Sequence, residues 1–237
     1  MVGVKDFILE FKTPFDRTAK AKKKATSIIK DRGEKPTKEL LEEEISNVLA
    51  EWEHKRQRGE RFQQKLCEKE ANTPNVIIGE YTKLEEIESI DNSICKLENN
   101  KTYLEKLLFS KKHKIIGYAD RIDVSRGTIN ITDNKVVSKI YRSGSFKTKD
   151  GFKIQGVKMQ APLENLDETN YNDFCLQLSL YMYLAWENNK HLKIGKLFIR
   201  HITMNDNDKV TSDNLIEVPY MKEEVVKMLK YKKLNED

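Results

Sequence analysis

Two runs of alternating apolar residues, separated by Arg126-Gly127, constrain the fold of this chain more than any other feature. The runs cover residues 116–124 and 129–136, and a hydrophobic period of two is typical of β-strands. Arg-Gly between them predicts a tight hairpin, because glycine accepts the positive φ that such turns require. In the register that this loop sets, Ile122 faces Ile131 on an apolar face.

The apolar face of this predicted hairpin ends in charged residues. The same register places Asp120 opposite Asp133, and Lys135 shares a face with Asp133 because side chains two apart in a strand point the same way. Facing carboxylates on a half-buried sheet repel each other, and burying them unpaired forces protonation. A divalent cation would relieve the repulsion, since hard cations bind carboxylate oxygens. An Asp–Lys ion pair at a strand end is the alternative interpretation, and the hairpin alone favours neither.

Length and composition set the broad class of protein. The chain has 237 residues, of which 34% are charged and 38% apolar, with a net charge of +5. This length suffices for one large domain or two small ones. No apolar run approaches the ~20 residues of a membrane span, and no signal peptide is recognisable. We therefore expect a cytoplasmic protein without a membrane partner.

The cysteines argue against one class of cofactor. Cys67, Cys95 and Cys175 lie far apart and show none of the spacings of metal-binding motifs. They are expected to be reduced thiols. Because an iron–sulfur cluster takes four cysteine ligands, no such cluster is expected in one chain.

Positive charge is concentrated around the predicted hairpin. Residues 110–158 carry twelve Lys or Arg and four acids. A basic field around an acidic centre suits a polyanion whose phosphate approaches a metal. Arg142, Lys147 and Lys149, in a long irregular connection over residues 138–165, are the candidate phosphate contacts. A solvated loop would explain these three side chains equally well.

The remaining elements follow from periodicity and from cap residues. A helical arm is expected over residues 5–31, and a long helix from Lys38 to about residue 71, capped by Thr37 and interrupted at Gly59. Further strands are expected at 76–81, 103–109 and 196–202, further helices at 167–188 and 222–231, and a polar loop at 203–214.

The order of these motifs resembles the PD-(D/E)XK nuclease superfamily, and more narrowly its RecB-type and phage exonuclease branch. Asp120 followed by Asp133-Asn134-Lys135 resembles the motif for which the superfamily is named. Gln177 and Tyr181 resemble the Gln-x-x-x-Tyr motif of the branch, and their spacing puts both on one helix face. Without the other motifs, a helix that packs polar residues on the sheet would explain the same pair. The resemblance spans about residues 40–204.

Two further segments carry the resemblance. Glu105, on the strand before Asp120, is similar in position to a family acid that lines the site, although a pairing with a nearby lysine would also explain it. Residues 52–63 resemble an N-terminal motif in which Trp and Gly precede a metal-associated His. Here Gln63 stands at the position of that His, and Glu60, one turn earlier, is a possible substitute. His54 is off the motif spacing and is expected at the surface.

The resemblance implies a fold and a domain organisation. The implied fold is α/β, with a mixed central β-sheet of four or five strands flanked by helices on both faces, as in a restriction-endonuclease-like core. A single domain is expected over 1–237, with a helical N-terminal region to about residue 71 and a core over about 76–204.

The resemblance also implies a chemistry. Asp120 and Asp133 would bind Mg²⁺ or Mn²⁺, with Glu105, Glu60, Gln63 or the backbone carbonyl of Asn134 completing the shell. Lys135 would position or deprotonate water, or stabilise charge on the phosphate. Gln177 and Tyr181 would hold the DNA strand or the water around the metal.

A metal-dependent DNA nuclease is thus the implied function. Exonuclease action in recombination, repair or phage DNA processing is favoured by analogy with the branch. The implied partners are DNA and either further copies of this chain or a single-strand-annealing recombination protein. The bacterial host cytoplasm is the expected location if a phage encodes the chain. A catalytically silent DNA-binding module and a structure-specific endonuclease are the alternatives.

Overall fold

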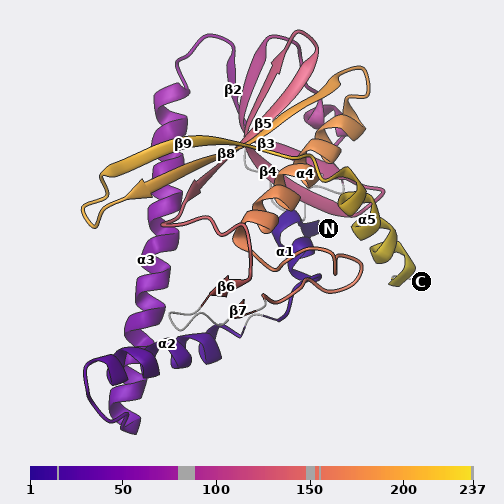
Figure 1. Cartoon of the computed structure of the whole chain (residues 1–237). Coiled ribbons are helices and arrows are strands. Elements are labelled where there is room, and N and C mark those ends of the chain that lie inside the picture. Colours follow the sequence, from indigo (N-terminus) through magenta and orange to yellow (C-terminus); the bar gives the residue numbers. More distant parts are fainter. Residues whose placement is uncertain (15, 80–88, 148–152, 155, 236–237) are drawn as a thin grey trace. The chain divides into compact units, whose positions relative to one another are not determined.

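The computed structural model describes residues 1–14, 16–79, 89–147, 153–154 and 156–235 (Figure 1). The chain groups into two compact units. The first, here the sheet unit, contains residues 1–12 and 65–237, and the second, here the helical unit, contains residues 13–64. Whether the whole chain folds as one domain, as the sequence predicts, stays a prediction.

A mixed seven-stranded sheet forms the sheet unit, and it confirms the predicted α/β class. The strand order is β2-β3-β4-β5-β8-β9, and β1 pairs with β4. β3, β4 and β5 are antiparallel neighbours, whereas β5 and β8 run parallel. The strands are β1 (Val2–Gly3), β2 (Val76–Ile78), β3 (Lys101–Ser110), β4 (Ile115–Ser125), β5 (Thr128–Val136), β8 (Lys193–Met204) and β9 (Val210–Val218).

The predicted number of four or five strands is wrong, because β1 and β9 lack a sequence signal. β1 is only two residues long and pairs Val2 with Ile115. β9 is an edge strand whose residues are mostly exposed, so polar side chains occupy both of its faces and no apolar alternation marks it. It includes residues 210–214, the last five of the polar loop predicted at 203–214.

The predicted β4–β5 hairpin register is confirmed as far as the two strands pair. Ile122 pairs with Ile131, and the last pair before the strands separate is Arg121 with Thr132. Gly127 has a φ of +71°, as the turn requires. The two strands therefore present Asp120 and Asp133 just beyond their paired region.

Helix α4 (Asn170–Asn188) covers one face of the sheet and packs against β3, β5 and β8 (Figure 1). Thr169 caps it, because its hydroxyl accepts a hydrogen bond from the Asn172 N–H. α1 (Val4–Leu9) and α5 (Lys222–Asn235) pack against α4. The prediction of a helical arm over residues 5–31 is wrong for the part that forms α1. This helix belongs to the sheet unit, because Phe7 is fully buried in its core.

The helical unit consists of α2 (Arg17–Asp31) and most of α3 (Lys38–Glu70). The bounds predicted for the long helix are confirmed, and the Leu40 N–H donates to the Thr37 hydroxyl at 3.3 Å. The predicted interruption at Gly59 is wrong, since α3 runs through it. One glycine inside a helix costs only about 1 kcal/mol, too little to break 33 residues of continuous helix.

The connection after β5 is less irregular than predicted. β6 (Phe146–Lys147) and β7 (Lys153–Ile154) form a small antiparallel pair. The backbones of Lys158 and Asp167 form an isolated antiparallel β-bridge. A short 3-10 helix, η2 (Asn92–Cys95), precedes β3. None of the helices in the described part of the chain combines the length and hydropathy that a bilayer span requires.

Candidate active site

Five of the predicted site residues come together in the sheet unit. Asp120 lies on β4, Asp133 and Lys135 on β5, and Gln177 and Tyr181 on the face of α4 that covers the sheet. The period of two on β5 and the spacing of four on α4 put each pair on a shared face, as the sequence predicts. We call these five residues the carboxylate cluster.

The side-chain amide of Gln177 links the lysine to one of the acids. The Lys135 Nζ donates to the Gln177 Oε1 at 2.9 Å and lies 2.5 Å from the Asp133 Oδ2. The Gln177 Nε2 donates to the Asp133 Oδ1 at 3.3 Å and to the Tyr181 hydroxyl at 3.1 Å. Asp133 is only 1% exposed, so this network replaces solvent around its carboxylate.

One oxygen of Asp133 is incompletely satisfied. The Asp133 Oδ2 is buried and accepts no hydrogen bond from a described residue, although the Lys135 ammonium lies within ion-pair distance. The short Nζ–Oδ2 distance without a hydrogen bond means that the Lys135 side chain approaches this oxygen at an angle outside hydrogen-bond geometry. Among the described residues, the Lys135 ammonium is thus the positive group that neutralises this buried oxygen.

Asp120 reaches across to the other strand. Its Oδ2 accepts a hydrogen bond of 2.7 Å from the Asn134 backbone N–H. Burial, and next the charge of Asp133, raise the pKa of Asp120 well above its usual range, while Lys135 and this N–H oppose the shift. The cluster therefore favours a protonated Asp120, or a cation bound beside it, over a bare Asp120 carboxylate.

Glu105 adds a third acid to the same electrostatic field. Its position in β3 lies between the pairs Leu104–Arg121 and Lys106–Ala119, which is opposite Asp120. Its charge contributes to the raised pKa of Asp120. Its φ of +49° is left-handed, a conformation that costs about 1–2 kcal/mol for a residue with a side chain. Such strain on a strand beside a cluster of acids is typical of a functional position.

Two glycines that sequence reasoning missed shape this region. A Cβ on Gly79 would lie 2.1 Å from the Glu105 carbonyl oxygen, and the Gly79 N–H donates to the Leu104 carbonyl at 2.7 Å. A Cβ on Gly117 would lie 2.6 Å from the ring of Tyr181. Both positions thus need glycine for close approach. A glycine inside each predicted strand is the only signal that the sequence offers for them.

Cys67 was also missed as a neighbour of the site. It lies near the C-terminal end of α3, within the sheet unit. Burial, and next the charges of Glu105 and Asp120, raise the pKa of the Cys67 thiol to about 11. The thiol is therefore neutral at physiological pH and is not a nucleophile.

Arg121 serves the opposite face of the sheet, as its register predicts. It forms ion pairs with Glu70 and with Asp123, the latter at 2.7 Å. Thr102 donates to the same Asp123 at 2.7 Å. This network attaches the last turn of α3 to β4 and leaves Arg121 out of the carboxylate cluster.

The other predicted residues remain predictions. Glu60 and Gln63 belong to the helical unit, and His54 is exposed as expected. Arg142 is exposed and lies over the Tyr171 ring at 4.8 Å. Lys149 and the side chain of Lys147 lie outside the described residues.

The donor chemistry of the carboxylate cluster fits a hard divalent cation. Asp120 and Asp133 supply carboxylate oxygens, and the Asp133 Oδ2 lacks a hydrogen bond. Among the residues that the structure describes, no three His, Cys, Asp or Glu side chains gather closely enough to hold a metal by themselves. The two aspartates therefore suit a cation that retains water or backbone ligands, as Mg²⁺ does.

Comparison with known proteins reveals only distant likeness. No protein-family model matches the chain, and no curated protein matches its sequence. The solved structure of SSO0001 is 14% identical with a TM-score of 0.31, over 100% of this chain and 76% of that one. A provisionally named exonuclease from Eubacterium rectale is 15% identical with a TM-score of 0.32, over 93% of this chain and 82% of that one.

Proposed function

We propose that this chain is a metal-dependent nuclease that hydrolyses phosphodiester bonds in DNA. The observation that carries the proposal is the bridge that Gln177 forms between Lys135 and Asp133, beside Asp120. Residues from two strands and a helix thus meet as one network of acids, a lysine and an amide. A cation, a water and a phosphate are the partners that such a set of side chains suits.

A purely structural Asp–Lys ion pair does not account for the whole cluster. The Lys135–Asp133 pair is present, as that interpretation expects. It leaves the Asp133 Oδ2 without a hydrogen bond, and it leaves Asp120 beside two further acids. One lysine among Asp120, Asp133 and Glu105 leaves an excess of negative charge, which a divalent cation would neutralise.

Asp120 and Asp133 would hold Mg²⁺ or Mn²⁺ in this proposal. The Asn134 carbonyl and Glu105 are further candidate ligands, as are Glu60 or Gln63 from α3. When bound, such a cation lowers the pKa of a coordinated water and polarises a phosphoryl oxygen.

The protein's own groups orient the reactants. The Lys135 ammonium is held in place by Asp133 and Gln177, and the Lys135 side chain is 12% exposed. There it would stabilise the negative charge that grows on the phosphate or position the attacking water. Gln177 fixes this ammonium from one side, and Tyr181 in turn fixes the Gln177 amide.

Exonuclease action is the favoured form of this activity, by analogy with the Gln-x-x-x-Tyr branch. Recombination, repair or phage DNA processing is the corresponding role, in a bacterial host cell if a phage encodes the chain.

Digestion of two DNA topologies tests the proposal. Linear and covalently closed circular DNA are incubated with the protein in Mg²⁺, Mn²⁺ or EDTA. Loss of linear DNA alone, only with metal, supports an exonuclease, and loss of both supports an endonuclease. Binding without cleavage under any metal condition would show a silent module and overturn the nuclease assignment. Asp213→Asn, an exposed acid paired with Arg200 on β8, is the matched control for Asp133→Asn.

A further inference from the structure

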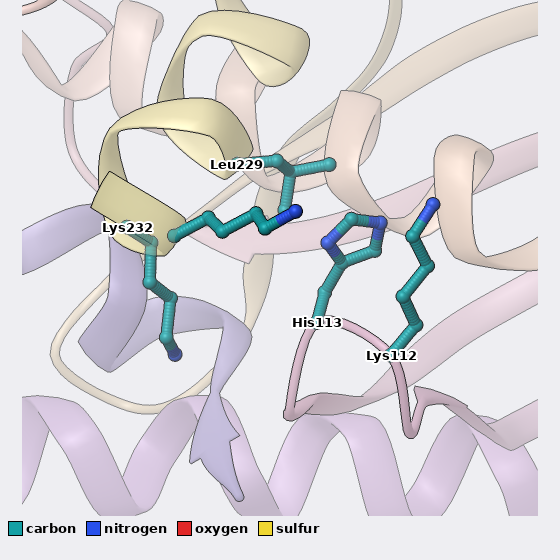
Figure 2. Close-up of a pocket in the computed structure, with 5 residues that line it drawn as sticks. Lys112, His113, Leu229 and Lys232 are labelled. Atoms are coloured by element: carbon teal, nitrogen blue, oxygen red, sulfur yellow. The ribbon is translucent and has the colours of Figure 1, made fainter. Parts of the chain in front are cut away.

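A second concave site lies in the sheet unit, apart from the carboxylate cluster. It is a pocket of about 250 Å³ between the β3–β4 turn and the end of α5 (Figure 2). Its lining residues in the described part of the chain include no acid, and they are Lys112, His113, Leu229, Lys232 and Lys233. Three lysines and a histidine thus line one opening, and the Lys232 Nζ lies over the Phe7 ring at 5.1 Å.

The β3–β4 turn that carries two of these residues is anchored at both ends. The His113 N–H donates to the Ser110 hydroxyl at 3.3 Å. The Lys114 carbonyl accepts a hydrogen bond of 2.8 Å from the Val2 N–H, and Lys114 holds a left-handed φ of +51°. The backbone of the turn at His113 and Lys114 is therefore held before any ligand arrives, which reduces the entropy lost on binding.

His113 forms the inner wall of the pocket. Its side chain is 16% exposed, and its Nε2 lies 3.3 Å from the Tyr183 hydroxyl and 3.6 Å from the Glu187 carboxylate on α4. One ring nitrogen is thus engaged by α4. Burial lowers the pKa of His113, Lys112 and Lys232 lower it further, and Glu187 opposes them. Figure 2 shows the ring between Lys112 and the end of α5.

Two of the three pocket lysines have no acidic partner among the described residues. Neither Lys112 nor Lys233 forms an ion pair with a described residue. Other lysines of the sheet unit are paired with acids, as in Lys12–Asp173, Lys158–Asp167 and Lys196–Glu217. Gathering like charges around a concave surface is unfavourable unless an anion neutralises them. Lysine ammonium groups are common ligands of phosphate.

We propose that this pocket binds a phosphate group. The site is separate from the carboxylate cluster, because Asp120 lies five residues into β4 from Ile115, a span of about 17 Å at ~3.3 Å per strand residue, and His113 lies in the turn before that strand. The phosphate belongs either to a free anion or to a nucleic acid backbone. The binding itself does not rest on nuclease activity.

Titration with inorganic phosphate tests the binding. The chain has four histidines, so the ring resonances are few in a ¹H–¹³C spectrum, and His113→Gln identifies that of His113. At constant ionic strength, added phosphate should move the His113 resonance saturably and raise its titration midpoint, because a nearby anion favours the imidazolium. The exposed His54 and His191 report non-specific effects.

Variants on both elements locate the site. The double variant Lys232→Gln/Lys233→Gln, on α5, should lower the phosphate affinity read from the His113 resonance at least tenfold. Lys112→Gln, on the β3–β4 turn, should also lower this affinity. Lys227→Gln with Lys230→Gln removes the same charge from exposed positions of α5 outside the pocket and should leave it unchanged. A His113 resonance that moves no more than that of His191, or that responds equally in all variants, would overturn the proposal.

A short DNA duplex in place of phosphate identifies the source of the anion. If the pocket holds a backbone phosphate, duplex DNA should move the His113 resonance. The Lys232→Gln/Lys233→Gln variant should then show a shallower slope of log K for DNA against log salt than the Lys227→Gln/Lys230→Gln control. A response to phosphate without a response to DNA assigns the pocket to a free anion. Both titrations are read in EDTA, so they succeed or fail independently of cleavage.

Discussion

Gln177 holds Asp133 and Lys135 through opposite ends of one amide, with its Nε2 3.3 Å from the Asp133 Oδ1 and its Oε1 2.9 Å from the Lys135 Nζ. The amide orientation is set by these partners, because only the NH₂ end can donate to a carboxylate and to the Tyr181 oxygen. The α4 helix thereby determines how the lysine of β5 is presented.

Replacing Gln177 should therefore slow cleavage without abolishing DNA binding. Gln177→Met keeps the size of the side chain but removes its hydrogen bonds to Lys135, Asp133 and Tyr181. We expect a fall of about 10–100-fold in the single-turnover rate, as for other groups that orient metal-site residues. Fluorescence anisotropy should show the same DNA affinity as wild type. A rate within twofold of wild type would show that the bridge plays no part in catalysis.

The raised pKa of Asp120 makes the metal-free protein sensitive to pH. An acid whose pKa is raised by folding contributes stability below its unfolded pKa, and this contribution is lost as the pH rises through the folded pKa. Asp120→Asn removes the titration, so it should unfold at higher urea concentration than wild type at pH 8 in EDTA. The two proteins should converge near pH 4. An equal difference at both pH values would exclude Asp120 as the cause.

Bound metal should make the wild type more stable than Asp120→Asn, the reverse of the order expected in EDTA at pH 8. Asp120→Asn and Asp133→Asn should each abolish cleavage, because each removes a carboxylate ligand. Saturating Mg²⁺ should raise the melting temperature of the wild type, since ligands that bind only the native state stabilise it. Neither variant should gain as much. A variant that keeps activity within tenfold of wild type would disprove the assignment of that ligand.

Gln63 is the position at which this chain departs from the motif that it resembles. If it takes the place of the family His, Gln63→His restores the residue type of that motif, a common metal ligand, and should keep or improve Mn²⁺ affinity. Gln63→Ala should weaken binding by less than Asp133→Asn does. Isothermal titration measures all three, and identical affinities for the Gln63 forms would place the residue outside the site.

Much of the carboxylate cluster could be predicted because its signals are local. The alternation around Arg126-Gly127 sets the register of β4 and β5, and the spacing of Gln177 and Tyr181 sets their common face. The strained Glu105 and its contact with Gly79 could not be predicted, since close approach of two backbones leaves no periodic pattern. Strand β9 was missed because an exposed edge strand has no apolar face.

The basic pocket could not be predicted either, because its residues come from distant parts of the sequence. Lys112 and Lys233 are more than a hundred residues apart in sequence, and each occurs in a lysine-rich segment that is typical of a solvated surface. Only the fold places the β3–β4 turn beside the end of α5. Charge patterning could identify the basic character of this protein but not the point at which its lysines converge.

The basic connection after β5 is predicted to bind the phosphates of DNA. Neutralising Lys147 and Lys149 together should flatten the slope of log K against log salt by about one unit for each phosphate that the variant no longer neutralises, through counterion release. Lys196→Gln with Lys209→Gln, on β8 and just before β9, is the matched control and should leave the slope unchanged. Equal slopes for wild type and the Lys147/Lys149 variant would show that the connection does not touch DNA.

Lys135 is expected to affect the cleavage rate and not the affinity for DNA. Its ammonium lies beside Asp133 and over the Phe174 ring at 4.8 Å, so it is held in place before substrate arrives. Lys135→Ala should lower the single-turnover rate by roughly two to four orders of magnitude, the range for positioned acid–base or charge-stabilising groups, with little change in DNA affinity. Lys135→Arg keeps the charge but cannot deprotonate, so partial rescue would assign the role to electrostatics rather than to a general base. Normal cleavage by Lys135→Ala, or a DNA affinity that falls in proportion to the activity, would show that this lysine is not catalytic.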